Sequence, residues 1–318
     1  MGEGQPVFDG MDILTLEFWI IYHIIISIFI VIDLYVAYRR EELTFRDATI
    51  WSIIWIIVGV AWGGVVYYFY GLEAVGLYMA AYLIEKMLSM DNLFVFAVIF
   101  SYFSVPMKNQ PLVLYVGILT AVIFRAAFIY GGILLIKAFH YSIIIFGLIL
   151  LYSGYKLTKQ EETSVEPEKN PIVRWARRYL PITEKYHGSK FLVRNAGKLY
   201  FTPLILVLFA IETTDIIFAV DSIPAVLAIT TDFFIAYTSN ISAVLGLRAL
   251  YSLIALTVLR FKYVRKALAI ILIYLGVKMI LSGLDIYTIS TQISISIVMV
   301  ILLTSIILSI LKKNGGDS

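Results

Sequence analysis

Long apolar runs separated by short polar segments cover most of the chain. A helix needs about 17–25 mainly apolar residues to cross the roughly 30 Å hydrocarbon core of a bilayer. Runs of that length lie at 14–37, 48–69, 74–100, 112–136, 139–156, 201–227, 233–259, 267–283 and 290–311. The pattern predicts an all-α, polytopic transmembrane helix bundle of about nine spans. The third, sixth and seventh of these runs contain acids or Arg that lower their hydropathy, so a bundle of eight spans is the alternative.

The positions of the basic residues predict the orientation. Cytoplasmic segments of membrane proteins are enriched in Lys and Arg. Of the 25 Lys and Arg residues, four lie inside spans, and with the N-terminus outside only Lys137 falls on the outer side. All the others then lie in cytoplasmic segments, so we expect the N-terminus outside and the C-terminus in the cytoplasm of a bacterial cytoplasmic membrane.

The segment 157–200 is the only long polar stretch between the predicted spans. Residues 172–180 are basic and aromatic, which is typical of a short helix lying on a membrane surface. Residues 191–201 contain an Asn-Ala-Gly sequence between two apolar pieces, which predicts two short strands. We interpret the positive charge of this cytoplasmic loop as a topological anchor, since no nucleic-acid-reading motif accompanies it.

The amino-acid composition limits the kinds of metal site and disulfide that the chain can form. The chain is 61% apolar and 15% charged, with no Cys and only 3 His among 318 residues. Disulfide frameworks, thiolate sites and multi-histidine metal sites are therefore excluded, and a metal site would depend on oxygen ligands. The first fifteen residues lack Lys and Arg, and no cleavage pattern follows the first apolar run, so we expect a retained first helix.

Three pairs of similar segments follow one another in the same order. Residues 85–92 resemble 215–222, each with an acid, then an aspartate six positions later and a small polar residue. Segment 120–128 resembles 243–251, and Leu151-Tyr-Ser-Gly-Tyr-Lys-Leu157 resembles Ile273-Tyr-Leu-Gly-Val-Lys-Met279. The chain is thus expected to contain two related units of three helices.

A repeat of three helices enters the membrane from alternate sides, so the two units would be inverted. Inverted repeats commonly place a substrate site near the bilayer midplane, where the units meet. We expect one transmembrane domain over 1–318. Its parts would be a first repeat at 74–156, the cytoplasmic loop at 157–200, a second repeat at 201–283, and peripheral helices at 14–37, 48–69 and 290–311.

Five acids lie inside two of the predicted spans, on the first helix of each repeat. They are Glu85, Asp91, Glu212, Asp215 and Asp221. An ionised side chain near the bilayer centre costs about 2.5–3.5 kcal/mol on insertion scales. Protonation, pairing with Arg125 and Arg248, or a bound cation would compensate. A single buried Arg–carboxylate pair is commonly structural, whereas five acids exceed what two or three basic residues neutralise and favour a divalent cation.

Helix geometry sets a condition on such a site. Residues six apart are rotated by about 120° on a regular helix, so Glu85 and Asp91 straddle a face. We expect the helices to loosen near the acids, with Pro224 freeing the carbonyl of Val220 on the second repeat. Carboxylate, amide and carbonyl oxygens suit Mn²⁺, Mg²⁺ and Ca²⁺. Asn92 is a candidate ligand beside the five acids.

Neighbouring polar residues are expected to support the site or to balance its charge. Ser89 and Ser222 are the small polar residues beside the acids. Arg125 and Arg248 hold equivalent positions in the two repeats. Lys86 is interpreted as a neutral buried amine, a counter-ion or a snorkelling surface residue, and the sequence does not choose between them.

The motifs resemble those of the TerC family of integral membrane proteins. The resemblance rests on Glu85-Lys-Met-Leu-Ser-Met-Asp-Asn92, on the segment from Glu212 to Pro224, on Tyr237-Thr-Ser-Asn240 and on Gly246-Leu-Arg-Ala-Leu-Tyr251. It covers most of the chain, and within the family the sequence is similar to the Alx-type members, which implies Mn²⁺ export and metal homeostasis. The resemblance also implies that six residues are metal ligands in this chain: Glu85, Asp91, Asn92, Glu212, Asp215 and Asp221.

From these observations we expect a transporter that exports Mn²⁺, with proton release on metal binding as a means of coupling and with no organic cofactor. Ca²⁺ is the alternative ion. A role in assembling other membrane proteins is the alternative of another class, with protein partners unspecified. We expect no enzyme activity: an intramembrane aspartyl protease pair at Asp91 and Asp221 would lack a Gly-x-Gly-Asp element and leave three acids unexplained.

Overall fold

A computed structural model describes residues 13–39, 44–159, 167–195, 197–256 and 262–313. The chain forms two compact units, 1–43 and 44–318. The described part of the first unit is one apolar helix, α1 (Ile13–Arg39). The second unit contains every other helix and a two-stranded sheet.

The helices of the second unit follow the predicted spans closely. In chain order they are α2 (Phe45–Tyr102), α3 (Gln110–Ala138), α4 (Ser142–Thr158), α5 (Pro171–Tyr179), α6 (Leu204–Ile229), α7 (Phe233–Val244), α8 (Leu247–Leu256), α9 (Lys262–Gly283) and α10 (Thr291–Lys313), with short 3-10 turns at Met107–Asn109 and Pro167–Lys169. Five helices of the described residues are long and apolar enough to cross a membrane, and two shorter ones are apolar. The described chain is therefore an all-α membrane bundle with a small polar insertion between α4 and α6.

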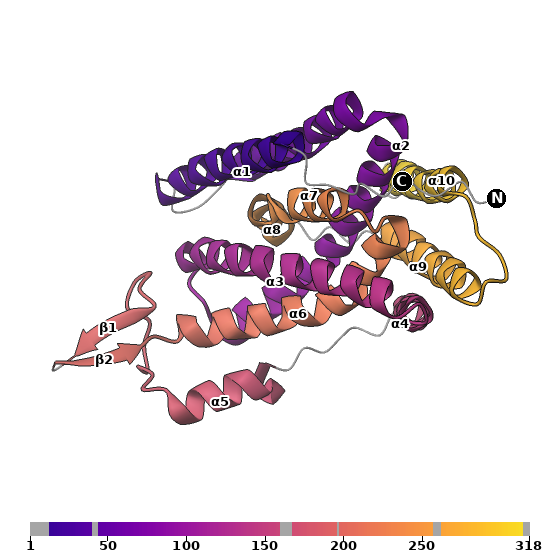
Figure 1. The fold of residues 1–318 in the computed structure, drawn as a ribbon. Coiled ribbons are helices and arrows are strands. Elements are labelled where there is room, and N and C mark those ends of the chain that lie inside the picture. Colours follow the sequence, from indigo (N-terminus) through magenta and orange to yellow (C-terminus); the bar gives the residue numbers. More distant parts are fainter. Residues whose placement is uncertain (1–12, 40–43, 160–166, 196, 257–261, 314–318) are drawn as a thin grey trace. The chain divides into compact units, whose positions relative to one another are not determined.

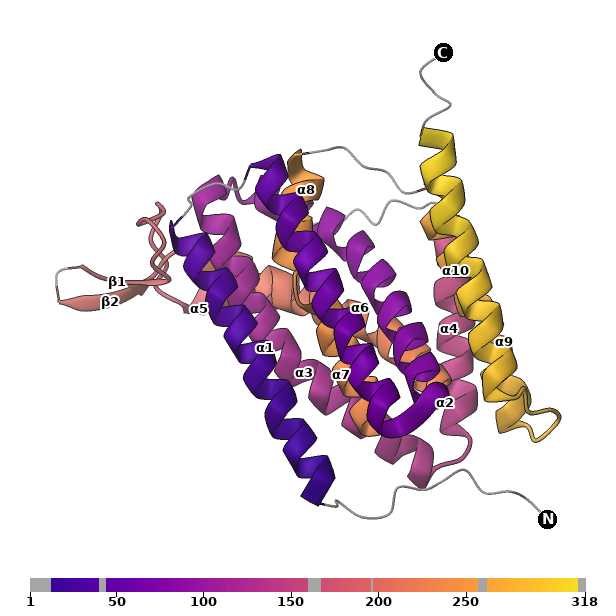
Figure 2. The ribbon, with the colours of Figure 1, turned by 90° about the horizontal axis from the view of Figure 1, so that it is seen from above.

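Two predicted spans form the single long helix α2. Its 58 residues exceed one crossing of a bilayer about 30 Å thick. Gly71 interrupts it with φ +81°, a left-handed conformation that glycine adopts without strain. The chain bends there, as Figure 2 shows, so α2 supplies two membrane-crossing halves.

The polar segment after α4 folds as the pattern indicates. Asn170 caps α5 by accepting the amide protons of Ile172 and Val173, and Pro171 opens the helix. Strands β1 (Leu192–Asn195) and β2 (Lys198–Phe201) form an antiparallel hairpin. In Figure 1 the hairpin lies at the start of α6, and α5 lies beside α6.

The helices of the two predicted repeats pack in a reciprocal way. Helix α2, whose second half is the first helix of the first predicted repeat, packs against α7. Helix α6, the first helix of the second predicted repeat, packs against α3. The third helices, α4 and α9, lie side by side in both ribbon views (Figures 1 and 2). The α2–α7 and α3–α6 contacts therefore correspond to one another when the two predicted repeats are exchanged.

Glycines bring the backbones of α4 and α9 into direct contact. A Cβ added at Gly276 would lie 2.7 Å from the carbonyl oxygen of Gly147, and one added at Gly147 would lie 2.9 Å from that of Gly276. A Cβ at Gly154, which is equivalent to Gly276 in the repeat pattern, would lie 3.0 Å from the carbonyl oxygen of Ala269. Small residues permit this approach in membranes, where helix association depends on close packing.

Replacing Gly276 by Val is expected to separate α4 from α9, because backbone atoms cannot move aside as a flexible side chain does. Overpacking of this kind costs about 1–3 kcal/mol. Thermal unfolding of the purified protein in detergent, followed by tryptophan fluorescence, measures the loss. Gly131→Ala is the control, since no atom lies within 4 Å of its added Cβ; equal melting temperatures for the two variants would contradict the packing.

Candidate functional site

The candidate site lies where α2, α3, α6 and α7 meet, and its centre is the guanidinium of Arg125. This side chain of α3 is fully buried, at 0% exposure. Its position on α3 follows from the helix pattern, since Ile123 on another face is 68% exposed. Gly117, Ala121 and Arg125 are spaced by four residues and therefore share the buried face.

Arg125 joins the acids of the two repeat-related motifs. Its Nε and Nη2 donate to the two carboxylate oxygens of Asp215 on α6, at 3.3 and 3.1 Å. Its Nη1 donates to Oε1 of Glu85 on α2 and to Oδ1 of Asn240 on α7, the latter at 3.1 Å. One guanidinium thus bonds to two carboxylates and one amide oxygen in the interior of the helix bundle.

Glu85 is held from its own helix as well. Ser89, one turn later on α2, donates to Oε1 of Glu85 at 3.2 Å, as residues four apart on one face can do. Oε2 of Glu85 is buried and has no hydrogen-bond partner in the part of the chain that the structure describes. The same holds for Nδ2 of Asn240. Buried polar atoms are normally bonded, so Oε2 of Glu85 has capacity to accept a further partner and Nδ2 of Asn240 has capacity to donate to one.

Two other acids of α6 lie apart from Arg125. Thr120 of α3 donates to Oε1 of Glu212, whose Oε2 has no partner among the described residues. Ser153 of α4 donates to Oδ1 of Asp221 at 2.7 Å. The hydroxyl groups stabilise the carboxylates through hydrogen bonds but do not neutralise them. The acids of α6 are therefore distributed along the helix and contact α3 and α4 in turn.

The remaining predicted residues are placed as follows. Asn92 and Ser222 are buried on α2 and α6, and Oγ of Ser222 has no partner among the described residues. Asp91 lies within α2, but its side chain is outside the described residues. Within the described residues, no three His, Asp or Glu side chains gather into a ready metal site.

The predicted loosening of the helices beside the acids is wrong. Gly71 is the non-helical residue inside α2, well before Glu85, and α6 continues through Pro224 as a helix. The span predicted at 233–259 is instead the one that breaks: α7 ends at Val244, Gly246 has φ +80°, and α8 begins at Leu247. Glycine allows that turn, and hydrogen bonds from Lys86 of α2 stabilise it.

Lys86 stabilises the break between α7 and α8. Its Nζ donates to the carbonyl oxygens of Ala243 and Leu245, at 2.9 and 3.1 Å. These carbonyls belong to the end of α7, where a helix leaves acceptors without intrahelical partners. Of the three interpretations of Lys86, a surface position is thus excluded, and its bonds go to backbone oxygens.

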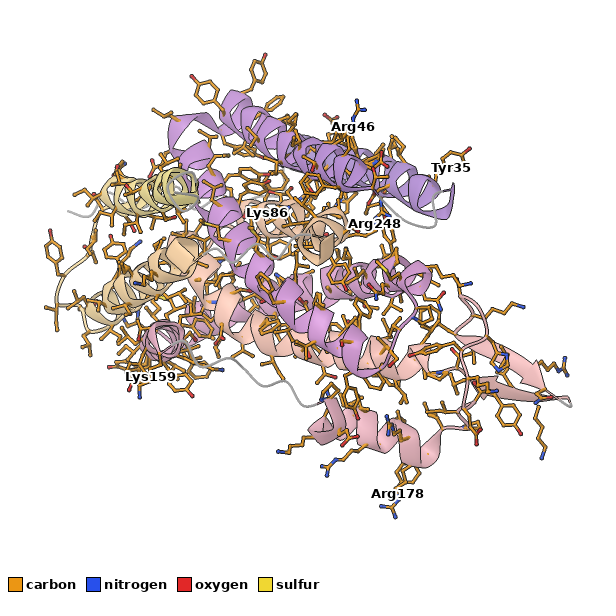
Figure 3. The ribbon with its side chains drawn as sticks, turned by 180° about the vertical axis from the view of Figure 1, so that it is seen from behind. Tyr35, Arg46, Lys86, Lys159, Arg178 and Arg248 are labelled. Atoms are coloured by element: carbon orange, nitrogen blue, oxygen red, sulfur yellow. The ribbon has the colours of Figure 1, made fainter. Side chains whose placement is uncertain are left out.

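Arg248 is the second residue of α8, directly after the break. It is 1% exposed, and its guanidinium carbon lies 5.1 Å from the ring centroid of Tyr115 on α3, within the range of a cation–π contact. Figure 3 shows Lys86 and Arg248 among the helices, whereas Lys159 and Arg178 lie on the outside. The interior basic residues therefore belong to the same region as the acids.

Sequence reasoning did not assign roles to three polar residues of this region. Asn240 accepts a hydrogen bond from Arg125, while Thr120 and Ser153 donate to the half-buried acids Glu212 and Asp221. Each stands within an otherwise apolar run, which is where membrane helices use small polar side chains to contact one another. That signal was present, but it did not say which acid each would meet.

A small, mainly apolar cavity adjoins the site. It is lined by Phe96, Leu114, Gly117, Ile118, Ala121, Ile211, Asp215, Val244 and Leu247. Asp215 is its only acidic lining residue. The cavity therefore touches the Arg125 cluster on the side of Asp215 and lies next to the start of α8.

These features define an integral membrane protein with a polar, charged core between its helices. Comparison with known proteins agrees: residues 70–316 match the model of the integral membrane protein TerC family. The chain belongs to the TerC family and is a multi-pass membrane protein.

Curated relatives cover nearly the whole chain. An uncharacterized membrane protein of Rickettsia bellii (strain RML369-C) is 39% identical over 300 residues, 94% of this chain and 99% of the relative. A putative membrane-bound redox modulator Alx of Escherichia coli (strain K12) is 38% identical over 302 residues, 92% of this chain and 93% of the relative. The Photorhabdus laumondii protein of the same name is 38% identical over 303 residues, 92% of this chain and 94% of that protein. No solved structure matches.

Proposed function

We propose that this protein is a transporter that exports Mn²⁺ from the cytoplasm through a midplane site of buried carboxylates. The observation that carries the proposal is the meeting of Glu85 and Asp215, from equivalent positions of two repeats, at one buried point. Buried acids in membrane spans commonly mark ion pathways. Their oxygens, with that of Asn240, suit a hard divalent cation.

The electrostatics support a cation as substrate. Arg125 carries one positive charge and bonds two carboxylates, while Glu212 and Asp221 are held by hydroxyl groups. The amine of Lys86 donates to two backbone oxygens. An anionic substrate would be repelled here. Mn²⁺ and Ca²⁺ both fit the oxygen donors, and Asp91 and Asn92 are proposed to join the ligand set.

The reciprocal packing supports an inverted repeat. When two units are related by a two-fold axis, a contact between residue i of one unit and residue j of the other occurs again between residue j of the first and residue i of the second. The contact of Gly154 with Ala269 and that of Gly276 with Gly147 are related in this way, as are the α2–α7 and α3–α6 contacts. We propose that rocking of one repeat against the other gives alternating access, with the N-terminus outside and the C-terminus in a bacterial cytoplasm.

A redox role through the protein's own thiols is excluded by composition, because the chain has no Cys. We propose no enzymatic activity and no organic cofactor. A role in assembling other membrane proteins is the competing function. It predicts that substitution of the buried acids leaves the protein's activity intact as long as the fold persists.

Reconstitution tests the proposal directly. Purified protein in liposomes that enclose a Mn²⁺-quenched fluorophore is expected to give protein-dependent quenching when Mn²⁺ is added outside. Added Ca²⁺ is expected to slow the quenching if the two ions share the site. Empty liposomes are the control, and absence of both Mn²⁺ movement and Mn²⁺ binding to the purified protein would defeat the proposal.

A further inference from the structure

The side-chain oxygens that are proposed to bind the transported cation are hydrogen-bonded to a positively charged side chain of the protein, Arg125. Arg125 contacts Glu85, Asp215 and Asn240 together, and its side chain is fully buried. We propose that Arg125 is a tethered competitor: its guanidinium holds the site in the resting state, and the divalent cation displaces it from Glu85 and Asn240. This inference rests on the proposed transport function.

The divalent cation and the guanidinium of Arg125 cannot occupy the site together, because both are positively charged. A divalent ion at ligand distance from Glu85 and Asn240 would lie within a few Å of the Arg125 guanidinium in its present position. Repulsion between such charges is strong in a low-dielectric interior. With the guanidinium displaced toward Asp215, the ion takes Glu85 while Asp215 remains paired. The ion and the guanidinium then each have a carboxylate.

The hydrogen-bond pattern indicates which side opens. Asp215 holds the guanidinium by two parallel bonds from Nε and Nη2, the planar geometry that Arg and carboxylates prefer. Glu85 and Asn240 share the single nitrogen Nη1. Rotation of the guanidinium about its bonds to Asp215 would release both of them together. Glu85 then offers Oε1 and the presently unbonded Oε2, beside the oxygens of Asn240 and Ser89.

The adjoining cavity has a volume of about 20 Å³, room for about one water molecule, and lies on the Asp215 side of the cluster. Gly117 and Ala121 lie on the same face of α3 as Arg125 and line the cavity together with Asp215. A guanidinium entering a mainly apolar space needs a partner, and Asp215 is in place to remain that partner. A movement of the guanidinium toward this side requires neighbouring side chains to shift, and it would keep the ion pair with Asp215 intact.

Equilibrium Mn²⁺ binding to the purified full chain tests the inference. Arg125→Gln removes the competitor, so its Mn²⁺ affinity is expected to rise at least about 10-fold above that of the wild type. Added guanidinium ion at millimolar concentration is expected to weaken Mn²⁺ binding by the variant Arg125→Ala, where it can occupy the vacated place, and to leave the wild type unaffected. Transport by either variant is expected to be slower, because nothing displaces the bound ion.

A structural ion pair predicts the opposite outcome. Arg125→Gln, folded by gel filtration and with an affinity equal to or weaker than the wild type, would overturn the inference. If neither variant folds, Arg125→Lys decides: an ammonium cannot form the two-pronged bond to Asp215, so tighter Mn²⁺ binding is expected and equal or weaker binding overturns the proposal. Arg174→Gln on α5 is the matched control. A wild type without Mn²⁺ binding or flux defeats the transport function itself.

Discussion

Mn²⁺ flux through the reconstituted protein is expected to fall at least about 100-fold when Asp215 is replaced by Asn. Even groups that only orient metal ligands are worth about 10- to 100-fold in affinity, and Asp215 bonds Arg125 through both of its oxygens. An amide carries no charge and offers one acceptor oxygen. Fluorophore quenching in liposomes, at equal protein content, measures the change.

The same substitution is also expected to lower stability. Removing one partner of a buried ion pair costs about 3–5 kcal/mol, because the other charge is left buried. Flux must therefore be compared for protein that passes gel filtration as a folded species. Bound Mn²⁺ is expected to raise the melting temperature of the wild type but not that of Asp215→Asn.

Asp232→Asn is the matched control for this experiment. Asp232 caps α7 by accepting the amide proton of Ile235 at 2.8 Å, and Asn serves as well in that position. The control removes the same charge from the same type of residue outside the Arg125 cluster, and its flux is expected to equal that of the wild type. Equal flux in Asp215→Asn and Asp232→Asn would show that the buried carboxylate is not needed for transport.

Replacing Gly246 by Val is expected to be the most destabilising change at the break between α7 and α8. A non-glycine residue at φ +80° is strained by about 1–2 kcal/mol. Its Cβ would also lie 2.4 Å from Cγ of Trp55, and overpacking adds about 1–3 kcal/mol. Thermal unfolding in detergent measures the total loss.

Two further variants separate these causes. Gly64→Val makes the same substitution in α2 where no atom lies within 4 Å of the added Cβ, and it is expected to cost much less. Combining Gly246→Ala with Trp55→Gly removes Cβ, Cγ and Cδ1 of Trp55, the three atoms nearest the added Cβ, and leaves the backbone strain. Gly246→Ala is therefore expected to cost less in the Trp55→Gly background than in the wild type. Full stability of Gly246→Val would show that the break does not depend on glycine.

The helices and the hairpin could be read from the sequence, because their signals are local. Apolar runs of membrane-spanning length give the helices, Asn170 and Pro171 start α5, and the Asn-Ala-Gly sequence lies at the turn between β1 and β2. The burial of two of the acids also followed locally, from their place inside apolar runs, whereas Glu212 and Asp221 are half-buried. Glu85 and Asp215 are both buried, as expected.

The partners of the acids could not be read in this way. Periodicity shows which residues share a helix face, but not which neighbouring helix that face meets. Thus Arg125 was a foreseeable counter-ion, whereas its simultaneous bonds to Glu85, Asp215 and Asn240 depend on the packing of four helices. The break at Gly246 was missed for a similar reason, because a glycine within an apolar run is also compatible with a continuous helix.

The sequence by itself determined that this chain is a multi-pass helical membrane protein of the TerC family with acids in its interior, because length, hydropathy and motif residues are properties of each segment alone. The tertiary structure decided that Arg125 occupies the centre of those acids, that Lys86 stabilises the end of α7, and that α4 and α9 touch through glycines. These are contacts between segments far apart in the chain, and only helix packing brings their atoms within bonding distance.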